Sequence, residues 1–275
     1  RLVYAAISGY GATSPYADRA GHDINYLGYA GALSVTGTPT TGPVLPGVQV
    51  GDVGGGGLSA LVAILAALHA RERTGRGQFC DVAMTDGALS WLTLHVAAFA
   101  ATGEVPRPGM EMLNGGLACY SIYACADGGH VAVGALEPQF FTTLVEALGA
   151  PELVDAHLDP ARQDEVRSRL AAIFATRTRD EWVSDLATID ACVAPVNDIA
   201  EALADPCLRA REMVLDRTVG DGSVFPTLGV VPRLRDTPGT AGAPPSPLGA
   251  DTDVLLAELG RSSDDIAALR SAGVV

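Results

Sequence analysis

The hydrophobic pattern of the N-terminal part of the chain predicts strands that alternate with helices. Residues 1–9 form an apolar run typical of a buried strand. Helical spacing begins near His22, and the segment LSALVAILAALHARER predicts a second helix that ends at the glycines of Thr74-Gly75-Arg76-Gly77. The segment QFCDVAM predicts another strand, and Thr85 or Asp86 is placed to cap the helix after it. This alternation is typical of an α/β domain.

The pattern changes beyond residues 105–116, where two prolines and three glycines interrupt the chain. The segment SIYACADGGHVAVGAL predicts a β-hairpin with Asp127-Gly128-Gly129 as its turn. Three helices and a strand are then predicted at 138–148, 164–175, 178–186 and 192–196. Thr178 and Glu181 have the spacing of a capping box, and Asn197 is placed to cap the next helix. Residues 206–249, rich in Pro, Gly and Thr, predict a connection before two closing helices at 253–259 and 263–271.

These elements predict two domains. We expect a large α/β domain over residues 1–105, a linker over 106–118, a small α+β domain over 119–206, and from 207–275 a linker that returns to the large domain. The hydrophobic fraction of 48% is enough for a large buried core. Residues 53–70 and 87–103 lack acidic and basic side chains, but both are near the lower length limit for crossing a bilayer. We therefore expect buried core helices there and no membrane span.

Composition and charge exclude several classes of function. Acidic residues exceed basic ones by 32 to 18, which gives a net charge of −14 and argues against nucleic acid as a partner. All 18 basic residues are arginine, so neither a Schiff-base lysine nor a Walker-type lysine is present. The five cysteines include no CxxC pair, which gives no support for a zinc or thioredoxin-like site. They are typical of thiols in a reducing compartment, and we expect the cytoplasm.

The opening segment RLVYAAISGYG has none of the features of a signal peptide. It has the pattern of a strand entered in mid-fold, so we expect the chain to lack its beginning.

Asp52 is the most informative acidic residue. It lies between an apolar run and a helix preceded by Gly54–Gly57, so we expect it at a helix N-terminus, where amides and the helix dipole favour a carboxylate. Capping alone would explain an Asp at this position. Four consecutive glycines exceed what a cap needs, and they suit close approach of the backbone by a ligand.

Two other residues have a spacing that suits chemistry. His22 is also near a predicted helix start, where the helix dipole favours a neutral imidazole that can act as a base. Its alternative explanation is pairing with Asp18 or Asp23. Glu137 ends a buried strand just before Pro138, which suits either an active-site carboxylate or a helix cap. None of these residues alone decides the function.

Together the motifs resemble a known family. The segments PYADRAGHDINYLGYAGAL, VGDVGGGGLSALVAILAALHARERTGRGQFCDVAM and LNGGLACYSIYACADGGHVAVGALEPQFF resemble the α-methylacyl-CoA racemase branch of the family III CoA-transferase (CaiB/BaiF) superfamily. The likeness continues to the closing PLGADTDVLLAELG. AGHDINYL and GALEPQF are typical of the racemase branch, whereas GDxGGG is shared more widely.

The resemblance implies a fold, a site and partners. It implies a Rossmann-like large domain, incomplete here because the family's N-terminal nucleotide-fold segment is absent, with a smaller α+β domain and an interlocked homodimer. His22 and Asp52 correspond to two catalytic bases on opposite faces of an acyl-CoA thioester, and Glu137 to the partner of the histidine. The segment Gly21, Asp23, Ile24, Asn25 and Tyr26 corresponds to residues that line the thioester. No metal or cofactor is implied, since CoA is part of the substrate.

The chemistry of these residues agrees with a racemase. Inverting the carbon next to a thioester carbonyl requires removing a proton from one face and delivering one to the other, and His22 and Asp52 are suited to those roles. Glu137 would stabilise the imidazolium, and a backbone amide such as that of Asp23 would hold the enolate oxygen. Two alternatives remain. Asp52 could be the nucleophile of a CoA transferase, or the chain could be a truncated, non-catalytic paralogue.

Overall fold

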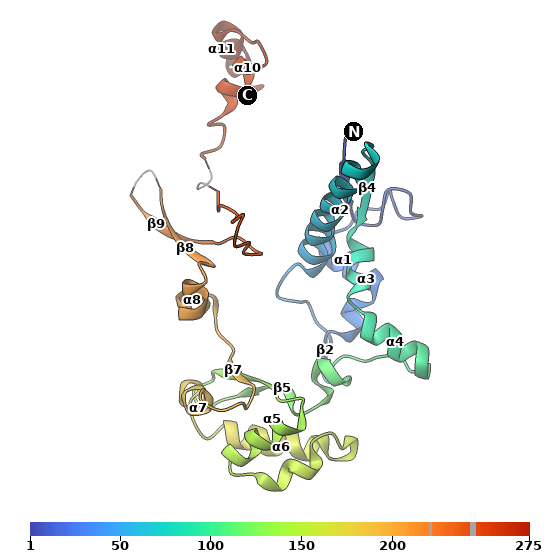
Figure 1. Ribbon diagram of the computed structural model, residues 1–275, viewed down its shortest axis with the longest axis vertical. Coiled ribbons are helices and arrows are strands. Elements are labelled where there is room, and N and C mark those ends of the chain that lie inside the picture. The colour runs from blue at the N-terminus through green and yellow to red at the C-terminus, as the bar shows by residue number, and fades with distance from the viewer. Residues whose placement is uncertain (220–221, 243–245) are drawn as a thin grey trace. The chain divides into compact units, whose positions relative to one another are not determined.

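The computed structural model describes residues 1–219, 222–242 and 246–275. These residues form two compact units, Arg1–Val196 and Asn197–Val275, and Figure 1 labels many of their elements. Helices and strands alternate through the first unit, which confirms the α/β class predicted from the sequence. The boundary between the units lies inside the predicted small domain of residues 119–206. The predicted domain and linker limits themselves stay predictions.

The first unit begins with two parallel strands and the helices around them. Strand β1 (Tyr4–Ser8) pairs in parallel with β4 (Phe79–Ala83), with Tyr4 opposite Phe79. Between them lie α1 (Asp23–Ala30), the 3-10 turn η1 (Ala32–Val35), the short ladder of β2 (Gly37–Thr38) with β3 (Gly42–Pro43), the π-helix η2 (Val50–Leu58) and α2 (Ser59–Thr74). After β4 come α3 (Met84–Ser90) and α4 (Thr93–Thr102).

The ends of two of these helices test the sequence signals. Helix α2 ends at Gly75, whose φ of 70° lies in the left-handed region that glycine adopts without strain, as predicted. The predicted cap at Thr85 or Asp86 is wrong, because α3 already begins at Met84. Strand β4 runs into α3 with no loop between them, so both residues fall in the first turn of the helix. The Thr85 hydroxyl instead donates to the Gly9 carbonyl at 2.7 Å.

The expectation that both uncharged stretches are buried core helices is wrong for the described chain. In α2 only Ala60 and Ala67 are buried, and α4 has no buried residue. Leu61, Val62 and Leu65 of α2 are more than half exposed. By length and composition alone, one helical stretch among the described residues, Val50–Thr74, could cross a membrane. Core helices of other proteins pass the same test, so this is weak support for a span.

The rest of the first unit is a three-stranded antiparallel sheet covered by helices. Its strands are β5 (Tyr120–Ala124), β6 (His130–Gly134) and β7 (Val193–Pro195), in the order β5-β6-β7. Its helices are α5 (Pro138–Ala147), α6 (Gln163–Phe174) and α7 (Arg179–Leu186), joined by the 3-10 turns η4 (Pro151–Ala156) and η5 (Pro160–Arg162); a short π turn, η3 (Met112–Gly116), precedes the sheet. The predicted hairpin is confirmed, with Asp127 accepting a hydrogen bond from the Gly129 N–H at 3.1 Å.

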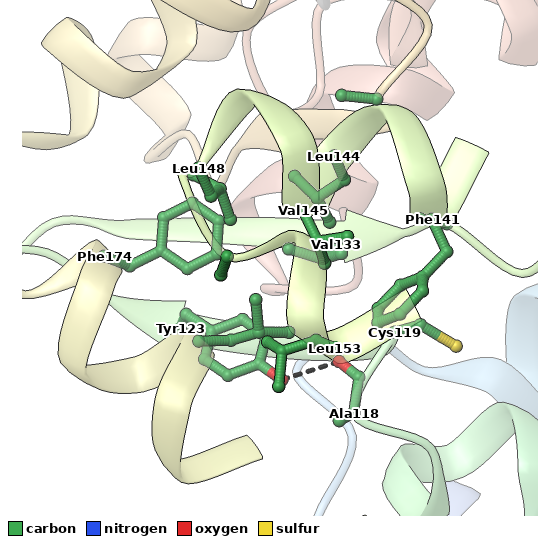
Figure 2. Close-up of a cluster of buried hydrophobic side chains, with 14 of the residues drawn as sticks. Ala118, Cys119, Tyr123, Val133, Phe141, Leu144, Val145, Leu148, Leu153 and Phe174 are labelled. Carbon is green, nitrogen blue, oxygen red and sulfur yellow. Dashed lines mark hydrogen bonds between the residues drawn. The ribbon is translucent and has the colours of Figure 1, made fainter. Parts of the chain in front are cut away.

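This sheet and its helices enclose the main hydrophobic core, which Figure 2 shows in part. Phe141, Leu144 and Phe174 are at most 1% exposed. The Tyr123 ring stacks against Phe174, and its hydroxyl donates to the Ala118 carbonyl at 2.6 Å, the dashed line in Figure 2. The predicted capping box is confirmed, since Thr178 accepts from the Glu181 N–H and Glu181 accepts from the Thr178 N–H.

We expect the stability of this core to fall above pH 10 because of Tyr123. Burial raises the pKa of Tyr123 above its usual value of 10.0. A tyrosine with a raised pKa in the folded state stays protonated after its unfolded counterpart has ionised, so its stabilisation is present below pH 10 and is lost as the pH rises. Urea unfolding at pH 9 to 11 should show that the free energy of unfolding falls as the pH rises. This fall should be smaller in Tyr123→Phe by up to about 1.4 kcal/mol per pH unit. Tyr120→Phe, at an exposed tyrosine, serves as the control. The prediction would be contradicted if the free energy of unfolding of Tyr123→Phe fell with pH as steeply as that of the wild type.

The second unit consists of short elements. They are α8 (Ile199–Ala204), α9 (Pro206–Ala210), the hairpin of β8 (Val214–Thr218) and β9 (Val224–Leu228), α10 (Thr252–Glu258) and α11 (Ser263–Ser271). The predicted cap at Asn197 is wrong by one residue: Asp198 accepts from the Glu201 N–H at 2.8 Å. The predicted connection over 206–249 is also wrong in part, because it contains α9 and the β8–β9 hairpin. Residues 220–221 and 243–245 of that segment lie outside the described residues.

Candidate active site

One hydrogen bond joins the two helix starts that carry His22 and Asp52. His22 is at the N-cap position of α1, and Asp52 is in the first turn of η2. The Asp23 carboxylate, next to His22, accepts a hydrogen bond from the Asp52 N–H at 2.9 Å. A side chain at Gly51 would place its Cβ 2.9 Å from the same carboxylate oxygen, so the Asp23 carboxylate would have to shift to admit it. The fold therefore joins the helix starts that carry His22 and Asp52, two of the predicted catalytic residues, although they are far apart in the sequence.

The backbone around His22 is held by residues of the same segment. The Asn25 side chain accepts a hydrogen bond from the His22 N–H at 3.1 Å. The Tyr26 hydroxyl donates to the Gly21 carbonyl, one residue before His22. The Tyr26 ring is itself held in place by Tyr10, edge to face at a centroid distance of 5.2 Å. These contacts fix the backbone of His22 and leave its imidazole exposed.

The site has two exposed titratable side chains and a hydrogen-bond donor without a described partner. The side chains of His22 and Asp52 both face solvent. The Asp23 N–H is at the first position of α1, where the helix itself supplies no acceptor. It also has no hydrogen-bond partner elsewhere in the described part of the chain. A base, an acid and an unpaired amide near one another can abstract a proton, return one and stabilise an oxyanion.

The glycine run after Asp52 has a different role from the one expected. Gly54, Gly55 and Gly56 are buried. A Cβ at Gly55 would lie 2.6 Å from the Met84 carbonyl oxygen and 3.0 Å from the Ala88 nitrogen, and one at Gly54 would overlap the Trp91 ring. The run therefore lets η2 pack against α3 backbone to backbone, and the expected approach by a ligand does not explain it. Capping does not explain Asp52 either, because the N-cap residue of η2 is Gln49. The prediction that Asp52 lies at a helix start is confirmed.

Glu137 lies on another part of the first unit. It is at the N-cap of α5 with its side chain exposed, and it makes no capping hydrogen bond. Local desolvation, followed by the negative charges of Glu137 and Asp190, raises the pKa of the Cys192 thiol. Among the described residues, no hydrogen bond or ion pair joins Glu137 to His22 or to Asp52. The structure thus brings together two of the three predicted catalytic residues.

The predicted substrate-binding residues fall into two groups. Ile24 is 45% exposed and Asn25 is exposed, so both can contact a ligand. Gly21 and Asp23 are half-buried, and Tyr26 is buried. The hydrogen bonds described for these three residues are to other residues of the protein. Two further residues were not predicted from the sequence: Tyr10, whose ring contacts that of Tyr26, and Gly51, which lies against the Asp23 carboxylate. Gly51 could have been noticed as the residue before Asp52; no sequence signal marks Tyr10.

Tyr26→Phe is expected to loosen the backbone at His22 with little effect on the fold. Burial, followed by the negative charges of Tyr10 and Asp52, raises the pKa of Tyr26, so its hydroxyl stays protonated as a donor well above neutral pH. Removing the hydroxyl should lower the free energy of unfolding by about 0.5–1.5 kcal/mol. Urea denaturation measures this loss, with Tyr4→Phe, an exposed ring in β1, as the control. A loss no larger than in Tyr4→Phe would contradict the role of the hydroxyl.

Groups of three or more side chains able to hold a metal ion are absent from the part of the chain that the structure describes. The five cysteines are free thiols.

On an α/β fold, an exposed imidazole and carboxylate beside an unpaired helix-start amide are chemically suited to proton or acyl transfer. The chain matches the family model described as CoA-transferase family III over residues 1–252 and belongs to that family.

Relatives and solved structures agree with this assignment. The α-methylacyl-CoA racemase of Mus musculus is 36% identical over 278 residues, which cover 100% of this chain and 72% of that protein. The succinyl-CoA–D-citramalate CoA-transferase of Chloroflexus aurantiacus is 30% identical, with coverage of 100% and 69%. The crystal structure of a CaiB/BaiF family protein from Brucella suis is similar at a TM-score of 0.76 and 30% identity, covering 94% of this chain and 68% of that one.

Proposed function

We propose that this protein interconverts the epimers of 2-methyl-branched acyl-CoA thioesters by proton transfer through an enolate. The observation that supports the proposal best is the hydrogen bond from the Asp52 N–H to the Asp23 carboxylate, which joins the two helix starts that carry His22 and Asp52. The likeness to α-methylacyl-CoA racemases of Mus musculus and Homo sapiens, at 36% and 35% identity, also favours this reaction.

In the proposed reaction each base serves one face of the substrate. One base takes the proton from the α carbon, the electron pair passes to the thioester oxygen, and the other base donates a proton to the opposite face. The Asp23 N–H is the proposed donor to the enolate oxygen, a position where a single donor contributes about 3 kcal/mol in other enzymes. Because all the steps are proton transfers, the proposal includes no metal or cofactor. Glu137 is proposed to stabilise the protonated imidazole, a role that rests on the family resemblance.

Deuterium exchange tests the proposal directly. The protein is incubated in D₂O with each epimer of a 2-methylacyl-CoA, and the α carbon is analysed by NMR and mass spectrometry. We expect deuterium at the α carbon and convergence of both epimers to one ratio. Binding without exchange or inversion would contradict the proposal and favour a non-catalytic paralogue.

CoA transfer is the second candidate. It is favoured by relatives described as CoA-transferases, such as succinyl-CoA:glutarate CoA-transferase of Homo sapiens at 30% identity, and by the exposed carboxylate of Asp52. In that reaction the Asp52 carboxylate attacks the thioester carbonyl and the CoA thiolate leaves, giving a mixed anhydride. Hydroxylamine added during turnover would convert the anhydride to a hydroxamate on Asp52, which mass spectrometry detects. A racemase gives no such adduct.

The proposal extends to a homodimer in the cytoplasm. Leu61, Val62 and Leu65 form an exposed apolar stripe on α2 that a second copy would cover. Light scattering after size exclusion should give a dimer mass, and charged substitutions at Val62 should shift it to the monomer. A monomer at all concentrations would contradict the dimer but not the reaction.

A further inference from the structure

The second unit contains a pocket of about 780 Å³ that the proposed reaction does not use. This volume is within the range of roughly 300–1,000 Å³ typical of small-molecule sites. One wall is strand β8, from which Leu215 and Arg217 line the pocket, and the other is the chain between Gly229 and Ala241. Side chains alternate along a strand, so the intervening Asp216 projects to the other face, where it pairs with Arg209 at 2.9 Å.

Hydrogen bonds between described residues hold the two walls together. The Gly229 N–H donates to the Met213 carbonyl at 3.0 Å, just beyond the end of β9. The Arg217 guanidinium donates to the Ala241 carbonyl at 3.2 Å. Arg233 bonds to the Arg211 carbonyl at 3.0 Å and to the Glu212 carboxylate at 2.8 Å. The pocket is therefore part of the folded unit.

The lining carries an excess of positive charge. Among the residues that the structure describes, four of the chain's 18 basic residues line the pocket, namely Arg211, Arg217, Arg233 and Arg235, against one acidic residue, Glu212. Glu212 is paired with Arg233. Within the described ranges the other three guanidinium groups have no ion-pair partner. In a protein of net charge −14, a local group of three uncompensated cations does not follow from composition.

Arg217 supplies a second, independent observation. Its Nε atom is buried and has no hydrogen-bond partner within the described part of the chain. A buried donor left without an acceptor costs free energy, and such groups are rare in folded proteins. Because the Nε atom has almost no accessible surface, a bound anion supplies the missing acceptor only when the Arg217 guanidinium turns toward the pocket.

We propose that this pocket binds an organic phosphate. A phosphate ester carries about two negative charges and several acceptor oxygens, which matches three uncompensated guanidinium groups better than a single carboxylate does. Val230, Leu234 and Pro238 give the lining apolar surface for the organic part of the ligand. The phosphate belongs either to the CoA part of an acyl-CoA or to a separate organic phosphate. The inference stands on the second unit alone and does not depend on the reaction proposed above.

Calorimetric titration of the whole chain with pyrophosphate and with adenosine 3′,5′-bisphosphate, at constant ionic strength, tests the site. We expect saturable binding and a Kd raised about tenfold or more in Arg217→Gln and in Arg235→Gln, as for loss of one charge-assisted bond. Arg261→Gln is the matched control: an exposed arginine of the same unit outside the pocket, whose Kd should match that of the wild type. Absence of binding to the wild type, or equal weakening in Arg261→Gln, would overturn the proposal.

Two further comparisons keep the test decisive. Arg217→Gln could fail to fold because the bond to Ala241 is lost, and the test of the pocket then rests on Arg235→Gln. This variant should fold, since Arg235 is exposed and makes no hydrogen bond to another described residue. CoA is then titrated into the same variants. A Kd for CoA that rises with that for pyrophosphate identifies the phosphates of CoA as the ligand, and an unchanged Kd for CoA identifies a separate organic phosphate. Wild-type affinity of Arg235→Gln for every probe would overturn the site.

Discussion

Replacing Asp52 with Asn is expected to reduce epimerisation by roughly 10²- to 10⁴-fold, the contribution of a positioned acid or base. Asn keeps the size of the side chain and removes the carboxylate. The Asp52 contact that orders the site is made by its backbone N–H, and its side chain is exposed, so the free energy of unfolding should change by less than about 0.5 kcal/mol. His22→Ala should have an effect of similar size, since its imidazole is also exposed.

The two variants should differ in which epimer they still exchange. Each loses the base on one face and should keep partial exchange of the epimer whose proton faces the remaining base, while the Asp23 N–H still stabilises the enolate. Asp164→Asn, an exposed acid in the first turn of α6, and His69→Ala, an exposed histidine on α2, are the matched controls. Full activity of both site variants with both epimers would show that the two-base assignment is wrong. Hydroxamate formation on Asp52 would favour CoA transfer in its place.

Leu144→Ala is expected to cost about 2–5 kcal/mol of stability. Leu144 is fully buried in α5, within the core shown in Figure 2, where neighbouring side chains surround it. Its truncation removes buried apolar surface and leaves a cavity that a close-packed core fills only in part. Urea denaturation followed by tryptophan fluorescence measures the loss, since Trp182 belongs to the same core.

The same substitution at an exposed leucine separates burial from residue type. Leu248 in the second unit is fully exposed, so Leu248→Ala should change the free energy of unfolding by less than about 0.5 kcal/mol. Equal losses in Leu144→Ala and Leu248→Ala would contradict the described core.

Local signals in the sequence were sufficient where neighbouring residues alone decide the conformation. The Asp127-Gly128-Gly129 turn, the Thr178–Glu181 capping box and the end of α2 at Gly75 were all predicted and are all present. Each depends on a backbone conformation that glycine permits or on a side chain that reaches a nearby amide. The predicted cap at Asn197 is wrong by one residue because Asn197 and Asp198 both suit a cap and the sequence does not select between them. The predicted cap at Thr85 or Asp86 is wrong because β4 runs directly into α3, whose N-cap position is Ala83.

The tertiary structure alone decided how distant residues meet. The sequence singled out His22 and Asp52 by type and place, but the bond that joins them runs through Asp23, and no periodicity encodes a contact across 29 residues. The glycine run was explained only by α3 packed against it. The group of arginines became visible only once the β8–β9 hairpin brought Arg217 and Arg235 to one pocket. A hydrophobic pattern records which face of a helix is apolar, but burial depends on what packs there, which is why α2 was expected in a core and is exposed in the described chain.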